Sequence, residues 1–318
     1  MAVGRRGVIF TFISITVLFF TITFIYNTSQ YRLRDNIFLA ESRIIALDRF
    51  ISDTESDLER ALYIAAFRTL LAMNPQDAAD DYITDIDDKF HEMMIYGNLD
   101  GQPRALINDS NILLWTEKME AQGSKLSILF SLTPLNIDVH MVSPWDVEVE
   151  LDSTLEVEDI GGAAKWVRNI TTRTKVNIIN FPDPVYGHGG AQPNIIKESV
   201  YTIEEIRTND DKLKEHWESQ RYLPCPGAPD YIQRLGGQLG GKSEYGIESL
   251  AFPSNYLPGP DIKNKSMVDH IYWSSANPIH CPVDVIPSLR MDNTEITVGV
   301  VGRWDFYDVN VDDARCST

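Results

Sequence analysis

The chain has 318 residues, of which 43% are hydrophobic and 23% charged, so it has the composition of a folded protein and is long enough to bury a sizeable core. Its 28 basic and 46 acidic side chains give a net charge of −18. This charge argues against sequence-independent binding of nucleic acid, which needs a positive field. Three cysteines are too few for a disulfide-framework miniprotein or for a domain with several zinc ions.

An uncharged apolar run occupies residues 8–26. As a helix these residues would span about 29 Å, close to the thickness of one hydrocarbon core. Arg5 and Arg6 precede the run, and no charged residue follows it until Arg32. The positive-inside rule then places the N-terminus in the cytoplasm and the rest of the chain outside the cell. We therefore predict a basic leader over 1–7 and a membrane-spanning helix, in contact with lipid, over 8–26.

Two other interpretations of this run are open. A cleaved signal peptide has a shorter apolar region and small residues at the cleavage site, whereas residues 24–27 read Phe-Ile-Tyr-Asn. The run is also compatible with the core helix of a soluble domain. We favour a retained anchor.

Residues 27–73 contain neither Pro nor Gly and show a helical repeat. Apolar side chains recur every seven residues, at Ile37, Ile44, Ile51, Leu58 and Ala65. With the anchor, this stretch predicts one helix of about 65 residues that ends at Asn74-Pro75. The stripe is typical of a helix packed on its own domain; the alternative is a self-associating coiled coil. A second amphipathic segment over 77–94 extends the predicted helical stalk to 27–95.

From about residue 126 the apolar period changes to two, which is typical of strands. Residues 137–141, 147–151 and 155–157 alternate in this way, and 166–179 is rich in Val, Ile and Thr. Gly161-Gly162 predicts the turn of a long hairpin. Ser110 is a candidate cap for a helix ending near Gly123. Further strands are expected at 268–273, 295–301 and 306–311. The prediction is an α+β protein whose 96–318 segment is a mainly antiparallel, β-rich extracellular domain.

One motif matches a phosphate-binding loop in form. Gly236, Gly241, Lys242 and Ser243 fit the pattern G-x-x-x-x-G-K-[ST]. Such a loop works between a buried strand and a long helix, and neither is indicated around it. We therefore interpret the match as a glycine-rich loop without nucleotide.

Acidic and cysteine residues suggest two further sites. Asp308, Asn310 and Asp312 share one face of the predicted C-terminal strand, a solvated face or a Ca²⁺ site completed by distant ligands. An exported domain favours one disulfide, and of the three pairings we slightly favour Cys281–Cys316 because both residues flank the C-terminal segment. No zinc-ligand spacing is present, so no cofactor other than Ca²⁺ is suggested. No nucleophile elbow or H-E-x-x-H motif occurs, so we predict that the protein is not an enzyme.

The N-terminus resembles the class III signal of type IV pilins and archaeal flagellins. The resemblance is carried by Arg5-Arg6-Gly7 followed by the apolar residues from Val8, and by a long helix leading into a β-rich domain. It implies cleavage between Gly7 and Val8, with the apolar helix kept as the core of a filament. The whole chain is also similar to uncharacterised archaeal single-pass envelope proteins, through residues 57–64, 181–184 and 245–250.

These observations predict a non-enzymatic envelope protein of the cell membrane. The leading hypothesis is a pilin-like or minor-pilin subunit of a surface filament or secretion pseudopilus, which self-associates through its N-terminal helix. The alternative is a membrane-tethered ligand-binding or sensor ectodomain that does not polymerise. An exported nucleotide-using enzyme would require the loop at Lys242 to bind nucleotide.

Overall fold

The computed structural model describes residues 4–74, 82–188, 194–252, 265–274, 280–286, 288–297 and 301–311, and the side chains of 4–8, 29–36, 188, 297 and 301 are not considered. The chain divides into two compact units. The first unit comprises Met1–Ser56, Met119–Ser131 and Leu155–Arg168, and the second comprises Asp57–Lys118, Leu132–Thr154 and Asn169–Thr318.

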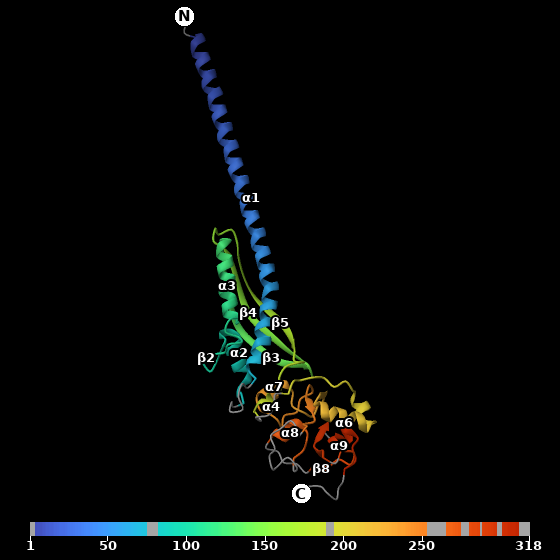
Figure 1. The fold of residues 1–318 in the computed structure, drawn as a ribbon. Helices are drawn as coiled ribbons and strands as arrows, with labels where there is room; N and C mark the ends of the chain where they lie inside the picture. Colours follow the sequence, from blue (N-terminus) through green and yellow to red (C-terminus); the bar gives the residue numbers. More distant parts are fainter. Residues whose placement is uncertain are drawn as a thin grey trace. The chain divides into compact units, whose positions relative to one another are not determined.

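Helix α1 is continuous from Gly4 to Ala72, as the absence of Pro and Gly after Gly7 predicts (Figure 1). Hydroxyl groups within its apolar part donate hydrogen bonds to carbonyls four residues back, which satisfies them without water. These donors are Thr16, Thr21, Thr23 and Thr28, at 2.6–2.9 Å. At the other end the Asn74 amide donates to the Leu70 carbonyl and to the Tyr231 hydroxyl, so the end of α1 is tied into the second unit.

The burial of α1 changes along its length. Over 9–28 and 37–45 its large apolar side chains are exposed, whereas from Leu47 onward one stripe is buried. Within the first unit, the Phe50 ring lies 6.0 Å from that of Phe130. Within the second unit, Phe67 packs edge-on against Phe181 at 5.1 Å. The later half of the predicted stripe therefore packs on its own domain, and the earlier half does not.

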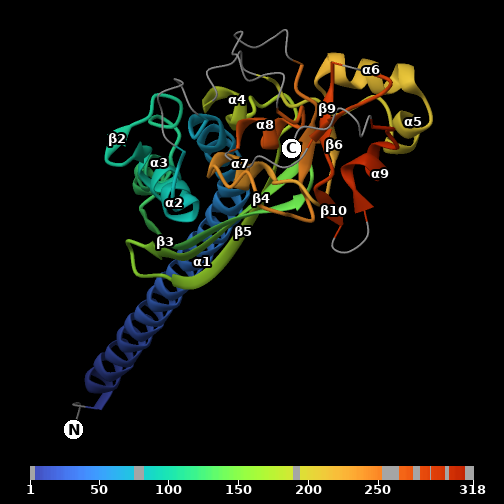
Figure 2. The ribbon, with the colours of Figure 1, turned by 90° about the horizontal axis from the view of Figure 1, so that it is seen from below.

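A three-stranded sheet follows in the order β3 (Ile128–Ser143), β4 (Asp146–Asp159) and β5 (Lys165–Asn177) (Figure 2). Side-chain contacts between β4 and β5 step two residues forward on one strand as they step two residues back on the other, which is an antiparallel register. The pairs are Glu148–Lys175, Glu150–Arg173, Asp152–Thr171, Thr154–Asn169 and Glu158–Lys165. The predicted hairpin is thus confirmed.

Strand β3 changes phase at Pro134. Its buried residues are even-numbered up to Leu132 and odd-numbered from Ile137. One extra residue in a strand shifts the alternation in this way, as in a β-bulge, and a bulge tolerates the missing N–H of proline.

Helix α2 (Ile86–Tyr96), the short strands β1 (Asn98–Leu99) and β2 (Gln102–Pro103), and helix α3 (Ile112–Lys125) lie between α1 and the sheet in sequence. The predicted cap of α3 was one residue early. The Asn111 side chain accepts the Leu114 N–H at 2.8 Å, whereas the Ser110 hydroxyl accepts from Arg68.

After β5 the described chain forms short helices and two-stranded ribbons, in which α5 packs beside α6 and α9 (Figure 2). The helices are α4 (Pro184–His188), α5 (Ile203–Arg207), α6 (Asp210–Ser219), α7 (Tyr231–Leu235), α8 (Asp269–Trp273) and α9 (Arg303–Tyr307). The strands are β6 (Tyr222–Pro224), β7 (Ile247–Ser249), β8 (His280–Pro282), β9 (Arg290–Asp292), β10 (Glu295–Thr297) and β11 (Val301–Gly302).

Antiparallel strands occur throughout the described part of 96–318, but they are long only as far as Asn177. Two expectations for this region were wrong. Residues 269–273 form helix α8, with four buried side chains in its five residues, so no strand-like alternation of burial develops. The 306–311 segment is the end of α9 followed by a loop, because Asp308 takes a left-handed conformation with φ 50°.

Candidate functional site

The first candidate site is the exposed apolar part of α1. Every large apolar side chain from Ile9 to Tyr26 is more than half exposed. Because successive residues turn by about 100°, these side chains surround the helix. A helix that is apolar on all sides needs an apolar environment. Ile9–Thr28 is the one helical segment, among the described residues, that is long and apolar enough to cross a membrane.

The predicted processing residues lie at the start of this helix. Gly7 and Val8 both belong to α1, in the turn after its first residue Gly4. Cleavage between them would remove only this first turn and would leave the apolar segment and the packed segment as one helix. The geometry is compatible with processing and does not require it.

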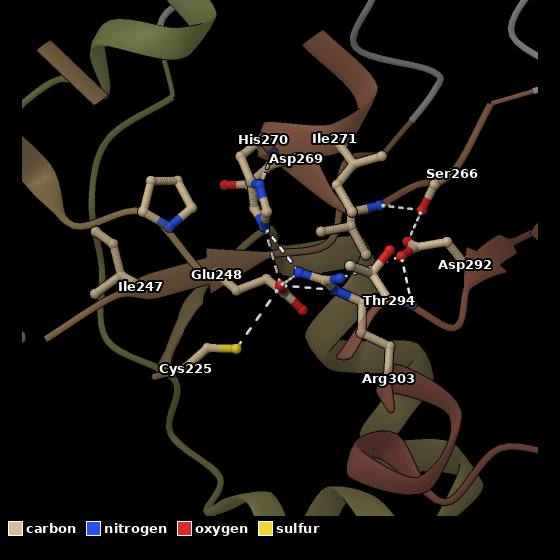
Figure 3. Close-up of polar contacts among 12 residues, drawn as sticks. Cys225, Ile247, Glu248, Ser266, Asp269, His270, Ile271, Asp292, Thr294 and Arg303 are labelled. Atoms are coloured by element: carbon tan, nitrogen blue, oxygen red, sulfur yellow. Dashed lines mark hydrogen bonds and ion pairs between the residues drawn. The ribbon is translucent and has the colours of Figure 1, made fainter. Parts of the chain in front are cut away.

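The second candidate is a buried ionic cluster in the second unit, built around two arginines. The Arg303 guanidinium at the start of α9 donates to Glu248 of β7 at 2.7 and 2.9 Å and to Asp292 of β9 at 3.1 Å (Figure 3). Glu248 also accepts from the Tyr307 hydroxyl at 3.1 Å. Ser266 donates to Asp292 at 2.6 Å. The side chains of Arg303, Glu248 and Asp292 are all fully buried.

Arg234 holds the other half of the cluster. Its guanidinium contacts Asp183 at 2.7 Å and Asp269 at 2.9 Å, and it also donates to the Ile247 carbonyl. The Tyr222 hydroxyl donates to Asp183 at 2.7 Å. Because Ile247 precedes Glu248 and Asp269 precedes His270, the two halves are joined through β7 and α8. Four carboxylates and two guanidinium groups thus share one interior.

His270 links the Arg303 half to a loop. Its Nδ1 lies 2.9 Å from the Leu239 carbonyl, which makes Nδ1 the protonated nitrogen. Its Nε2 lies 3.0 Å from Arg303 Nη2 and 3.2 Å from Glu248 (Figure 3). The ring nitrogen Nε2 therefore contacts both members of the Arg303–Glu248 ion pair.

The electrostatics of Glu248 and Cys225 oppose catalysis by these two groups. Burial disfavours the charge of Glu248, but Arg303 outweighs it and holds the pKa of this carboxyl well below its usual range. Burial raises the pKa of the Cys225 thiol well above its usual value, and Glu248 at 3.8 Å raises it further. A carboxylate already occupied by several donors and a protonated, buried thiol serve neither as general acid nor as nucleophile. The cluster joins loops and short helices into one core.

The glycine-rich loop does not form a phosphate cradle. Gly236 follows the short helix α7, and no helix begins after Ser243 within the described stretch 231–252. The N–H groups of Gly236, Gly241 and Ser243 bond to carbonyls of the same region. Lys242 donates to the Glu295 carbonyl at 3.0 Å. These N–H groups and the Lys242 ammonium are thus already bonded within the protein.

The remaining predicted residues are only partly described. Asp308 and Asn310 are both exposed beside the buried Val309, but they lie in a loop, and Asp312 lies outside the described residues. Among the residues that the structure describes, no group of three or more His, Cys, Asp or Glu side chains is arranged to hold a metal. Cys281 is disulfide-bonded and Cys225 is a free, buried thiol. Cys316, the predicted partner of Cys281, lies outside the described residues.

Comparison with protein-family models, with curated proteins and with solved structures finds no match to this chain.

Proposed function

We propose that this chain is a non-enzymatic protein of the cell membrane, anchored once by residues 8–26, with its N-terminus in the cytoplasm and its folded part outside. The observation that carries the proposal is the continuity of α1. The same helix has an exposed apolar segment over Ile9–Thr28 and a segment buried in a folded domain from Leu47 onward. Arg5 and Arg6 precede the apolar segment and favour this orientation.

We further propose that it is a pilin-like subunit of a surface filament or secretion pseudopilus. A helix whose first part is apolar all round and whose later part packs against an antiparallel sheet suits lateral packing of such helices, with the folded part displayed. In the first unit the helix and sheet meet at Phe50 and Phe130. The occupied acceptors and raised thiol pKa of the ionic cluster support a structural rather than a catalytic interior.

The test is the mass of the N-terminal peptide of the protein purified from its native membranes. A start at Val8 supports processing and filament assembly, and Gly7→Val should then abolish it while Gly4→Val, four positions before the cleavage site, should not. A start at Met1 or Ala2 would replace the filament proposal with a membrane-tethered binding or sensor ectodomain. A start beyond Tyr26 would overturn the anchor itself.

A further inference from the structure

An exposed apolar patch lies on α1 after the proposed membrane span. It consists of Ile37, Phe38, Ile44 and Ile45, which are 66%, 73%, 40% and 47% exposed. On a helix these four side chains fall within an arc of about 120°. They belong to the first unit, yet that unit does not cover them, although it buries Leu47 and Ile51 only a turn further along.

Lipid does not reach this patch if Ile9–Thr28 spans the membrane. Ile37 lies nine residues and Ile45 seventeen residues beyond Thr28, which is about 13 and 25 Å along the helix. The headgroup layer adds only about 5–8 Å on each side of the hydrocarbon core. The patch therefore stands in water unless another protein covers it, and large contiguous apolar surfaces of this kind mark interaction sites.

A second copy of the chain is the partner that fits. Copies that assemble from one membrane have parallel helices and present the same patch on the same side of their anchors. Glu41 lies within the patch and Arg49 at its margin, and both are exposed. Within the described part of the chain neither forms an ion pair. They are eight residues apart, as are Ile37 and Ile45, and eight residues correspond to about 12 Å along a helix.

We propose that neighbouring copies pack in parallel through this patch, displaced along the helix by about eight residues. The displacement sets Ile37 of one copy against Ile45 of the next and Glu41 against Arg49. Without it, Glu41 would face Glu41 of the neighbour, which is repulsive. A displaced contact uses different surfaces on the two copies, so it can repeat from copy to copy. This inference rests on the proposed anchor and specifies the contact of the proposed assembly.

Disulfide crosslinking tests the displacement directly. Full-length Glu41→Cys and Arg49→Cys chains are expressed separately and together in native membranes and then oxidised. Coexpression should give a crosslinked dimer, and either variant alone should give much less. Wild type reports any background through the buried Cys225, and Glu218→Cys, an exposed position on α6, serves as the matched control. Crosslinking of Glu41→Cys with itself, or no dimer above the control, overturns the proposal.

Charge reversal is the second test. Glu41→Arg and Arg49→Glu should each reduce the assembled fraction in sedimentation of mild-detergent extracts, and the double variant should restore it. Additive losses in the double variant would contradict a Glu41–Arg49 contact. Resistance of each variant to alkaline extraction reports the anchor separately. A protein that stays in the membrane but fails both tests retains its anchor and loses this interface, whereas alkaline release of wild type would remove the anchor on which the inference rests.

Discussion

The exposed part of α1 and the ionic cluster of the second unit place side chains in opposite ways. Over 9–28 and 37–45 large apolar side chains lie on the surface, whereas Arg234, Arg303 and their carboxylates lie in an interior. In the cluster, each arginine and each carboxylate has a partner of opposite charge within the chain. The exposed apolar side chains of α1 have no such cover among the described residues, so lipid or another protein would have to supply it. The difference separates charges that are paired within the chain from apolar side chains that are not buried within it.

The most direct test of this difference is to remove one charge from the cluster. Arg303→Met should leave Glu248 and Asp292 buried without their cation, which typically costs about 3–5 kcal/mol. We expect a large loss of the free energy of unfolding, measured by urea titration of the full chain in detergent with tryptophan fluorescence.

The matched control removes a cation from an exposed pair. Arg173 of β5 contacts Glu150 of β4 at 2.7 Å on a solvated face, and Arg173→Met should change the urea midpoint little. Equal effects of the two substitutions would mean that burial does not determine how much the ion pairs of the cluster contribute to the free energy of unfolding.

The two halves of α1 give the next test. Leu62 is fully buried, and Leu62→Ala should cost about 2–5 kcal/mol because it leaves a cavity. Phe38→Ala removes a larger side chain, but one that is 73% exposed, and should leave the unfolding of the detergent-solubilised monomer nearly unchanged. If Phe38→Ala destabilises the monomer as much as Leu62→Ala does, the patch is not a free surface.

The same contrast explains what the sequence could predict. Helix α1 and the β4–β5 hairpin extend over many periods, so their apolar patterns accumulate into a clear signal. Helix α8 has five residues, little more than one turn, and four of them are buried, so its short apolar stretch was mistaken for a strand. The long elements were accessible from local pattern, and the short ones depend on tertiary packing.

The ionic cluster was missed for a different reason. Arg303 and Glu248 are 55 residues apart, and Arg234 and Asp183 are 51 apart, so no spacing motif connects them. The available signal was a charge inside an apolar stretch, as with Glu248 before Leu250 and Ala251. Such a charge indicates that a buried partner is needed but does not identify it.

His216 is a buried polar group of the second unit that, unlike the residues of the cluster, lacks hydrogen-bond partners among the described residues. Neither ring nitrogen has a hydrogen-bond partner among the described residues, and burial lowers its pKa to about 4. The unfolded chain therefore takes up a proton first as the pH falls. Up to about 3 kcal/mol of stability should be present above pH 6.5 and be lost as the pH approaches 4.

The variant His216→Phe keeps an aromatic ring next to Tyr307, which lies 6.4 Å away, and removes the titration. Urea midpoints measured between pH 7 and 4.5 should fall less steeply in this variant than in wild type. Parallel curves would assign the acid sensitivity to the carboxylates instead.

The smallest expected effect concerns a single backbone group that the chain satisfies internally. The Asn111 side chain accepts the Leu114 N–H at 2.8 Å at the start of α3, as a helix cap does. Asn111→Ala should cost about 1 kcal/mol, because that N–H loses its acceptor at a nearly buried position. Asn111→Asp keeps the acceptor and should recover most of the loss in urea titration.

Ser110→Ala separates this cap from the one that the sequence suggested. Ser110 binds Arg68 rather than a free N–H of α3, so its substitution should leave the helix intact. A larger effect at Ser110 than at Asn111 would return the cap to the predicted residue.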